Sequence, residues 1–421
     1  MKNKIIFRKE YLLQLKKIIA FDKKTGKTIW ISDKVYPQHF YPLSIKDYCN
    51  VVKKAVLNGF QDIPILSISV KDYPYCDFNC KDCLACLSRE WAVNNSNIKY
   101  PIIPIDIYKN VLTEISNYSK NLGFTGVRYE ICGEGNPDLY SKREEIIRFA
   151  VEKCDMNVVY VSTGSRISET LLDILVKYAS CIRISFPGIG EDAYEFYSSQ
   201  RNEKVFRYND ALVLLERLTA RRKRYKKEDE LMIGVRTCIR PLNEGHYKEF
   251  IKTIGALGVD SFQAVRVLTP DYSKHKTENI SQKVIIELLE LKEIHKQLGI
   301  CSFQIPNNLE KIYNDRSLRE EKKFSKCWSS HVSPILYGTN LISCALWDKI
   351  MDKNYHYGIL EGNKNEVSKV FKSTKSKSID KNCPLNCNEC CAYSDNRTMD
   401  DLYKVLRAYD DVKNIDFYFE Y

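Results

Sequence analysis

From residue 64 onward, short apolar runs rich in β-branched residues alternate with amphipathic stretches. Short apolar runs of this kind indicate buried strands, whereas apolar residues recurring every three or four positions indicate helices. The predicted strands cover 64–70, 126–131, 157–162, 181–185, 231–237 and 261–267. The predicted helices lie near 104–121, 141–153, 169–179, 203–220, 244–257 and 281–298. This alternation predicts an α/β fold with a parallel sheet that is either curled or doubly wound.

The two ends of the chain have different patterns. Ile18 to Asp22 and Lys27 to Ser32 read as two strands joined by a Lys-Lys-Thr-Gly turn, and 44–59 reads as a helix. Near the other end, Gly338 divides two short apolar runs into a second hairpin, and 366–372 is an apolar helical stretch.

A cysteine motif follows the first strand of the alternating region. Cys76, Cys80 and Cys83 form a CxxxCxxC triplet. Three thiolates can hold three irons of a [4Fe–4S] cluster and leave the fourth iron open to another ligand. Zinc is the competing interpretation, because thiolates at short spacing also suit tetrahedral zinc and Cys86 would repeat the spacing.

Further polar and glycine residues stand where the other strands end. Cys132 to Pro137 follows the second strand, Ser162-Thr163-Gly164 ends the third, and Ser185 ends the fourth, with Gly188 just beyond it. Functional groups of parallel α/β folds gather at the carboxyl ends of the strands. We therefore expect these segments and the cysteine triplet on one rim of the sheet.

Over residues 64–300 the triplet and the rim segments resemble the radical S-adenosylmethionine (SAM) superfamily. The resemblance implies a partial (β/α)6 TIM-like barrel whose cluster, on Cys76, Cys80 and Cys83, binds SAM at its open iron. It also implies SAM-binding roles for one residue set: Gly133 and Glu134 at the amino group, Ser162, Thr163 and Ser185 near the ribose, and Arg201 at the carboxylate. A guanidinium fork suits a carboxylate.

Two positions depart from the pattern of that superfamily. Asp82 precedes the third cysteine, where relatives carry an aromatic residue against the adenine. Cys132 replaces the first glycine of the Gly-Gly-Glu segment, and a non-glycine residue adopts positive φ only at a cost.

A second group of cysteines lies in the last hundred residues. Cys327 and Cys344 flank the hairpin at Gly338, and 383–391 reads CPLNCNECC. The pattern resembles the SPASM or twitch module of radical SAM enzymes, which implies one auxiliary [4Fe–4S] cluster, because no cysteine follows Cys391. The ligand set closest to the twitch pattern is Cys327, Cys344, Cys387 and Cys390, with Cys383 or Cys391 as substitutes and a structural zinc as the alternative.

The combined patterns predict three domains. Residues 1–60 are expected to form a hairpin and helix cap, 61–300 the radical SAM partial barrel, and 301–421 a small cysteine-rich auxiliary-cluster domain.

Composition sets limits on compartment and partners. Charged residues interrupt the first 24 positions, so no signal peptide is expected, and no stretch is long enough to span a membrane. Sixteen cysteines then favour a reducing cytoplasm. The net charge of +11 includes a basic run at 221–227, which we interpret as a solvated loop rather than a patch for an acidic partner such as a peptide leader, a nucleotide or a flavodoxin-type electron donor. Nucleic acid is not expected, because no nucleic-acid-binding motif accompanies the charge.

The resemblance implies an oxidoreductase or maturase. Such an enzyme takes an electron from a flavodoxin or ferredoxin, cleaves SAM reductively to a 5′-deoxyadenosyl radical and abstracts a substrate hydrogen. We expect oxidation or crosslinking of a peptide or protein, with dehydrogenation of a sugar or aminocyclitol alcohol as the small-molecule alternative. A non-catalytic metal-binding scaffold is the hypothesis from another class. No catalytic acid or base stands out among the 54 acidic residues.

Overall fold

The structure of the protein is a computed structural model. The described residues are 17–32, 45–59, 63–73, 75–80, 83, 102–132, 135–198, 206–265, 267, 280–306, 309, 327–343, 356–373 and 393–420.

A ten-stranded sheet forms the centre of the molecule, in the order β12-β11-β10-β3-β4-β5-β6-β7-β8-β9. Its seven strands from β3 to β9 are parallel and follow one another in chain order. They are β3 (Ser67–Lys71), β4 (Arg128–Cys132), β5 (Asn157–Ser162), β6 (Ala179–Phe186), β7 (Met232–Cys238), β8 (Ser261–Val265) and β9 (Ser302–Gln304). Among the described strands, the end strands β12 and β9 do not pair with each other, so the barrel is open. The predicted α/β fold with a partial barrel is confirmed.

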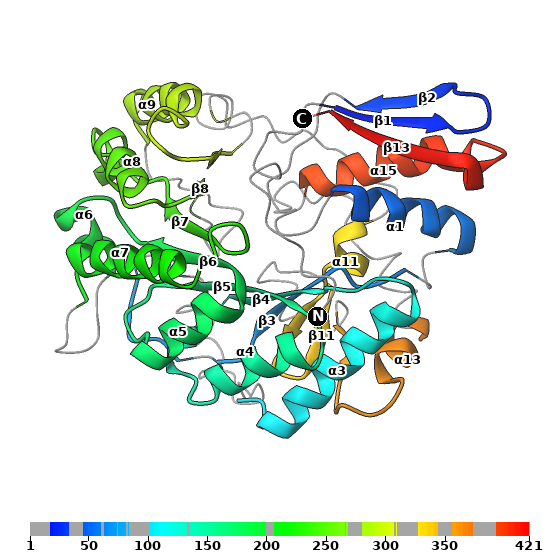
Figure 1. Cartoon of the computed structure of the whole chain (residues 1–421), viewed down its shortest axis with the longest axis horizontal. Helices are drawn as coiled ribbons and strands as arrows, with labels where there is room; N and C mark the ends of the chain where they lie inside the picture. Colours follow the sequence, from blue (N-terminus) through cyan, green and yellow to red (C-terminus); the bar gives the residue numbers. More distant parts are fainter. Residues whose placement is uncertain are drawn as a thin grey trace.

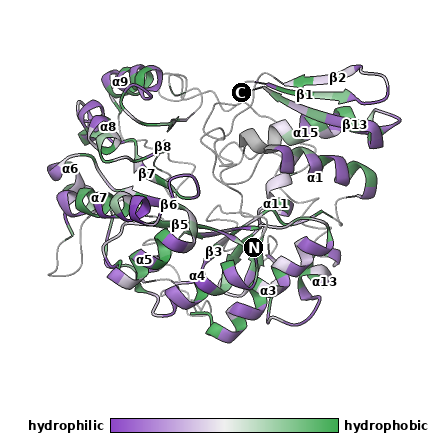
Figure 2. Ribbon diagram, viewed as in Figure 1, coloured by the Kyte–Doolittle hydropathy of each residue, from purple (hydrophilic) through white to green (hydrophobic). Residues whose placement is uncertain are grey.

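Helices follow the strands around the outside of the curved sheet (Figure 1). They are α3 (Ile105–Asn121), α4 (Arg143–Glu152), α5 (Glu169–Tyr178), α6 (Glu191–Ser198), α7 (Tyr208–Arg224), α8 (Tyr247–Ala256) and α9 (Gln282–Ile294). Hydrophobic and hydrophilic residues are mixed along them (Figure 2), and their apolar residues pack on one face of the strands in a single large core. The sequence predicted every one of these helices except α6.

The predicted hairpin at Gly338 extends the barrel sheet. β10 (Ile335–Tyr337) and β11 (Asn340–Ile342) are antiparallel, and Gly338 between them has a φ of 57°. β10 also pairs in parallel with β3, while β12 (His356–Ile359) pairs with β11. The helix α13 (Glu366–Lys372) follows, and Phe371 stacks on Tyr118 of α3 with 5.6 Å between ring centroids. This hairpin therefore joins the sheet at β3, the strand that leads to the cysteine triplet.

The two ends of the described chain form a smaller unit with its own core. β1 (Lys17–Asp22) pairs with β2 (Thr28–Ser32) as predicted, and also with β13 (Ile415–Glu420). In Figure 1 these blue and red strands lie side by side above α1 (Ile45–Asn58) and α15 (Tyr393–Arg407). Trp328 of α11 (Trp328–Val332) is buried in the same core. None of the described helices is long and apolar enough to span a bilayer.

Residues 223–226 of the basic run at 221–227 are exposed, as the sequence predicted, but the run begins inside a helix. α7 continues to Arg224, and the Arg221 Nε lies 2.9 Å from a carboxylate oxygen of Asp173 on α5. Arg222 is buried and forms an ion pair with Asp260. The prediction of a solvated loop is therefore wrong for Arg221 and Arg222, because the carboxylates that neutralise them come from distant parts of the sequence.

Candidate functional site

The cysteine triplet lies in a loop that starts just beyond β3. We call residues 75–83 the cysteine loop, of which 75–80 and 83 are described. The Asn136 N–H, from the turn after β4, donates to the Tyr75 carbonyl at 2.7 Å, and the Asn79 N–H donates to the Ser198 carbonyl at the end of α6 at 3.3 Å. Phe78 is buried in the main core. These contacts hold the cysteine loop against the rim that the strand ends form.

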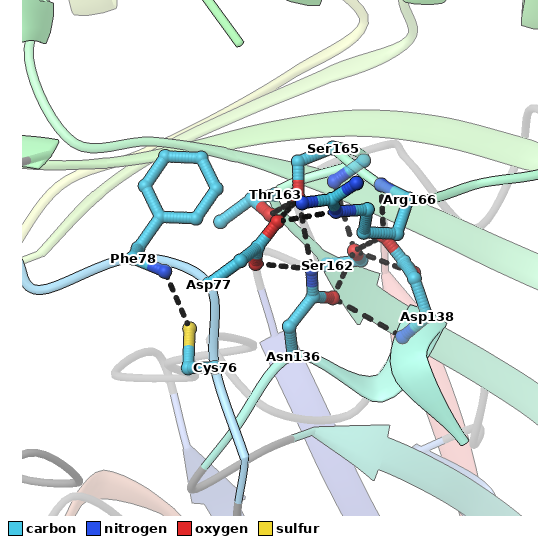
Figure 3. Close-up of polar contacts among 10 residues, drawn as sticks. Cys76, Asp77, Phe78, Asn136, Asp138, Ser162, Thr163, Ser165 and Arg166 are labelled. Carbon is cyan, nitrogen blue, oxygen red and sulfur yellow. Dashed lines mark hydrogen bonds and ion pairs between the residues drawn. The ribbon is translucent and has the colours of Figure 1, made fainter. Parts of the chain in front are cut away.

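Asp77 forms the polar centre of this attachment (Figure 3). Its Oδ1 accepts a hydrogen bond from Asn136 Nδ2 at 2.9 Å, and its Oδ2 accepts from Ser165 Oγ at 2.9 Å and from Arg166 Nε at 3.0 Å. Asn136 is only 1% exposed and also donates to Ser165 Oγ at 2.8 Å. The residue beside the first cysteine is thus held by groups from the turns after β4 and β5.

Two of the predicted SAM-binding residues lie beside this network. Ser162 Oγ donates to the Asp138 carboxylate at 2.7 Å and accepts from the Gly164 N–H at 2.8 Å. Thr163 Oγ1 lies 3.2 Å from Ser165 Oγ. Burial raises the pKa of Asp138, although hydrogen bonds from Tyr160 and Ser162 oppose the rise. Both residues are on the expected rim, and their contact with a ribose stays a prediction.

A buried ion pair between Asp72 and Arg143 stabilises the rim next to the cysteine loop. Asp72 directly follows β3 and receives two hydrogen bonds from Arg143, with Nη1 to Oδ2 at 2.6 Å and Nη2 to Oδ1 at 2.9 Å. The Tyr108 hydroxyl donates to the same carboxylate at 2.8 Å, and Arg143 Nε donates to the Pro137 carbonyl at 3.0 Å. Arg143 therefore links the end of β3 to the turn that carries Asn136.

The thiols of the cysteine loop influence one another. Burial raises the pKa of Cys80, and the neighbouring Cys83 and Cys76 raise it further because adjacent thiolates repel. The Phe78 N–H donates to Cys76 Sγ at 3.4 Å, and the Cys83 N–H donates to the Cys80 carbonyl at 3.1 Å.

The residues present fit an iron–sulfur cluster by their chemistry. In the described part of the chain, no group of three or more His, Cys, Asp or Glu side chains is arranged to hold a single metal ion. Cys76, Cys80 and Cys83 nevertheless lie on one anchored loop, and three cysteine thiolates are the ligands that a [4Fe–4S] cluster with one open iron requires.

The other predicted site residues have different positions. Ser185 is near the end of β6, and Cys327 precedes the first residue of α11, with its carbonyl accepting from Ser330 Oγ at 2.6 Å. Several lie outside the described residues: Gly133, Glu134, Arg201, Cys344, Cys387 and Cys390, together with Asp82, Cys86, Cys383 and Cys391.

The inner face of the barrel carries a second ion pair. Arg128 Nη2 lies 2.6 Å from Glu130 Oε2, which also accepts from Ser69 Oγ at 3.0 Å. Burial by itself would raise the pKa of Glu130, but the charges of Arg128 and Arg183 lower it to about 2. Glu130 is therefore ionised at neutral pH and holds β3 and β4 together from inside.

We expect Glu130 to make the protein sensitive to acid. Its pKa is lower in the folded chain than the ordinary value of 4.5, so its contribution to stability is complete above pH 4.5 and is lost as the pH falls towards about 2. Urea unfolding of the wild type and of Glu130→Gln should show a stability difference that shrinks over this range. A difference independent of pH there would contradict the lowered pKa.

We also expect Asn136 to hold the cysteine loop in place. Asn136→Ala removes the donor to Asp77 and leaves that carboxylate with fewer partners, which costs about 1–3 kcal/mol. After anaerobic loading with iron and sulfide, the variant should lose iron to a chelator faster than the wild type. Asn209→Ala, on exposed α7 surface, is the matched control and should release iron at the wild-type rate. Equal rates for all three proteins would contradict a positioning role.

Sequence reasoning missed Asp77, Asn136, Asp138, Ser165 and Arg166. Asp77 lies within the cysteine motif, and Asn136-Pro137 ends the glycine-containing segment after β4, so their positions were visible. Their pairing was not, because it depends on β3, β4 and β5 lying side by side in parallel.

Solved structures with the same fold support the radical SAM resemblance at the level of architecture. No protein-family model and no curated protein matches the sequence. Streptococcus suis SuiB bound to its precursor peptide SuiA aligns over 86% of this chain and 75% of its own, with a TM-score of 0.56 and 12% identity. Native anSMEcpe with bound AdoMet aligns over 78% of this chain and 87% of its own, with a TM-score of 0.54 and 13% identity. Both are radical SAM enzymes with SPASM or twitch-type modules, so this chain has the fold of that class.

Proposed function

We propose that this protein is a radical SAM enzyme that oxidises or crosslinks a peptide or protein substrate. The observation that carries the proposal is the position of Cys76, Cys80 and Cys83 in an anchored loop at the carboxyl end of β3, in a fold shared with AdoMet-bound enzymes. Peptide-bound forms of SuiB and anSMEcpe have the same fold and favour a peptide over a sugar as the substrate.

The described residues have three roles in the proposed site: they bind the cluster, position the cysteine loop and stabilise the strand ends. A [4Fe–4S] cluster with bound SAM supplies a 5′-deoxyadenosyl radical, and Cys76, Cys80 and Cys83 would be its thiolate ligands. Asp77 and Asn136 fix the loop that carries these thiols. Below them, Asp72 and Arg143 keep the strand ends together. The open inner face of the barrel receives the substrate.

The auxiliary cluster is part of the same proposal. Cys327, Cys344, Cys387 and Cys390 would form a closed four-thiolate site. A cluster without an open iron is suited to electron transfer, so this centre would accept the electron left on the substrate and make the net reaction an oxidation. A flavodoxin or ferredoxin is the proposed source of the electron that starts each SAM cleavage.

The test is anaerobic loading with iron and sulfide, reduction with dithionite and addition of SAM, followed by quantification of 5′-deoxyadenosine and of iron per chain. We expect 5′-deoxyadenosine together with about eight irons per chain, as two four-iron clusters require. Tightly bound zinc without SAM cleavage would overturn the proposal and favour a metal-stabilised scaffold. SAM cleavage with about four irons would retain the enzyme and remove the auxiliary cluster.

A further inference from the structure

The inner face of the open barrel carries a row of polar side chains near the carboxyl ends of four adjacent strands. Ser185 of β6 is in register with Arg236 of β7, Arg236 with Gln263 of β8, and Gln263 with Gln304 of β9. We call these four residues the polar row. Their strand neighbours Ile184, Val235, Phe262 and Phe303 belong to the main core under the helices, so alternation puts the polar row on the opposite, concave face.

The polar row has hydrogen-bonding capacity that the described residues do not use. Gln263 Nε2 donates to Gln304 Oε1 at 3.2 Å, whereas Gln263 Oε1 is buried and has no partner among the described residues. Arg236 is partly shielded from solvent and makes no hydrogen bond or ion pair with any other described residue. A partly desolvated guanidinium and a buried acceptor side by side indicate a place for a ligand with both an anionic group and an N–H.

A second arginine of the inner face, Arg183, lies two residues before Ser185 on β6, further from the carboxyl end of the strand. Arg183 of β6 is in register with Gly234 of β7. A Cβ at Gly234 would lie 2.4 Å from Ser261 Oγ, so the glycine leaves room for that hydroxyl, and it would lie at contact distance, 3.4 Å, from Arg183 Cγ. Arg183 also has no hydrogen bond to another described residue, although its charge acts on Glu130.

The charges on this face are unbalanced. Its basic residues are Lys71, Arg128, Arg183 and Arg236, and Glu130 is the acidic residue that alternation places there among the described strands β3 to β9. Arg128 is paired with Glu130. The positive charges of Arg183 and Arg236 on this concave, partly shielded face attract an anion.

We propose that the polar row, with Arg183 beneath it, binds an acidic residue of the peptide substrate. Arg236 receives the Asp or Glu side-chain carboxylate in a bidentate contact, and Gln263 Oε1 accepts a backbone N–H of the same peptide. The inference rests on the proposed function, because it assigns a substrate class to the same site. SAM also carries a carboxylate that Arg236 could bind. The experiment therefore distinguishes the peptide carboxylate from the SAM carboxylate.

The test begins with selection of random short peptides from a displayed library on the cluster-loaded full-length protein with SAM bound. We expect Asp and Glu to be enriched in the bound peptides. In one selected peptide, changing the acidic residue to its amide should weaken binding about tenfold or more, as for the loss of a charge-assisted hydrogen bond. Arg236→Gln should weaken binding of the original peptide by a similar factor. The Arg236→Gln protein should bind the amide peptide little more weakly than either change alone would predict.

Arg148→Gln on the outer surface of α4 is the matched control, because it removes the same charge from an exposed position. It should leave peptide affinity unchanged, which separates local contact from attraction to a basic protein. Selection without acidic enrichment, or additive losses in the pairwise comparison, would overturn the inference. If Arg236→Gln does not fold, Arg236→Lys keeps the charge without the fork and should still weaken binding of the acidic peptide.

The affinity of Arg236→Gln for SAM identifies the source of the carboxylate. We expect its SAM dissociation constant to stay close to that of Arg148→Gln, whereas a tenfold or greater increase would assign the guanidinium to the cofactor and overturn the inference. SAM cleavage by the wild type without peptide reports the proposed function separately. If the protein cleaves SAM but selects no acidic peptides, the binding inference is rejected and the proposed function is retained.

Discussion

Cys80→Ala is expected to abolish 5′-deoxyadenosine formation and to lower iron content by about four atoms per chain. Cys80 packs against the main core between Cys76 and Cys83, so its thiol is the central donor of the triplet. Two thiols cannot hold a cluster that needs three, and without that cluster no electron reaches SAM. Iron analysis and product quantification on the anaerobically loaded proteins measure both effects.

Cys154→Ala is the matched control for this experiment. Cys154 is a buried cysteine away from the cysteine loop, and it packs in the main core with its Sγ 3.8 Å from Thr113 Oγ1. Its replacement should retain full iron loading and SAM cleavage, with a stability loss of about 1 kcal/mol. If Cys80→Ala matched this control in both measurements, the cysteine loop would not be the cluster site.

Arg143→Met is expected to destabilise the fold severely. It leaves the Asp72 carboxylate buried without its cation, and breaking a buried pair in this way costs about 3–5 kcal/mol. Because Arg143 also donates to the Pro137 carbonyl, the turn that carries Asn136 should loosen as well. Urea unfolding of the protein before cluster loading gives the free energy directly.

Arg148→Met changes the same residue type five residues further along α4, where the side chain is exposed. Its effect should stay within about 0.5 kcal/mol, as for most surface substitutions. Similar losses for the two variants would mean that the buried pair is not what stabilises the rim. Asp72→Asn adds a further check, because it leaves the Arg143 charge unpaired and should also destabilise the fold.

Local patterns predicted the barrel well because each strand and helix carries its own periodicity. β5 was predicted with its observed bounds, and the starts of α5 and β8 were predicted to the residue. β9 was not predicted, because a strand of three residues gives little periodic signal. β13 was missed although its apolar residues Ile415, Phe417 and Phe419 alternate along the strand. The pairing of β13 with β1 joins segments about four hundred residues apart, which no local pattern reports.

The sequence by itself determined the alternating fold, the cysteine triplet and the rim on which the triplet would lie, since these depend on residue type and spacing along the chain. Only the tertiary structure decided how the loop is held by Asp77 and Asn136, why Arg222 leaves solvent, and which residues form the polar row. These features depend on which strands become neighbours and in what register. Burial then decides which charges must be paired and which remain available to a ligand.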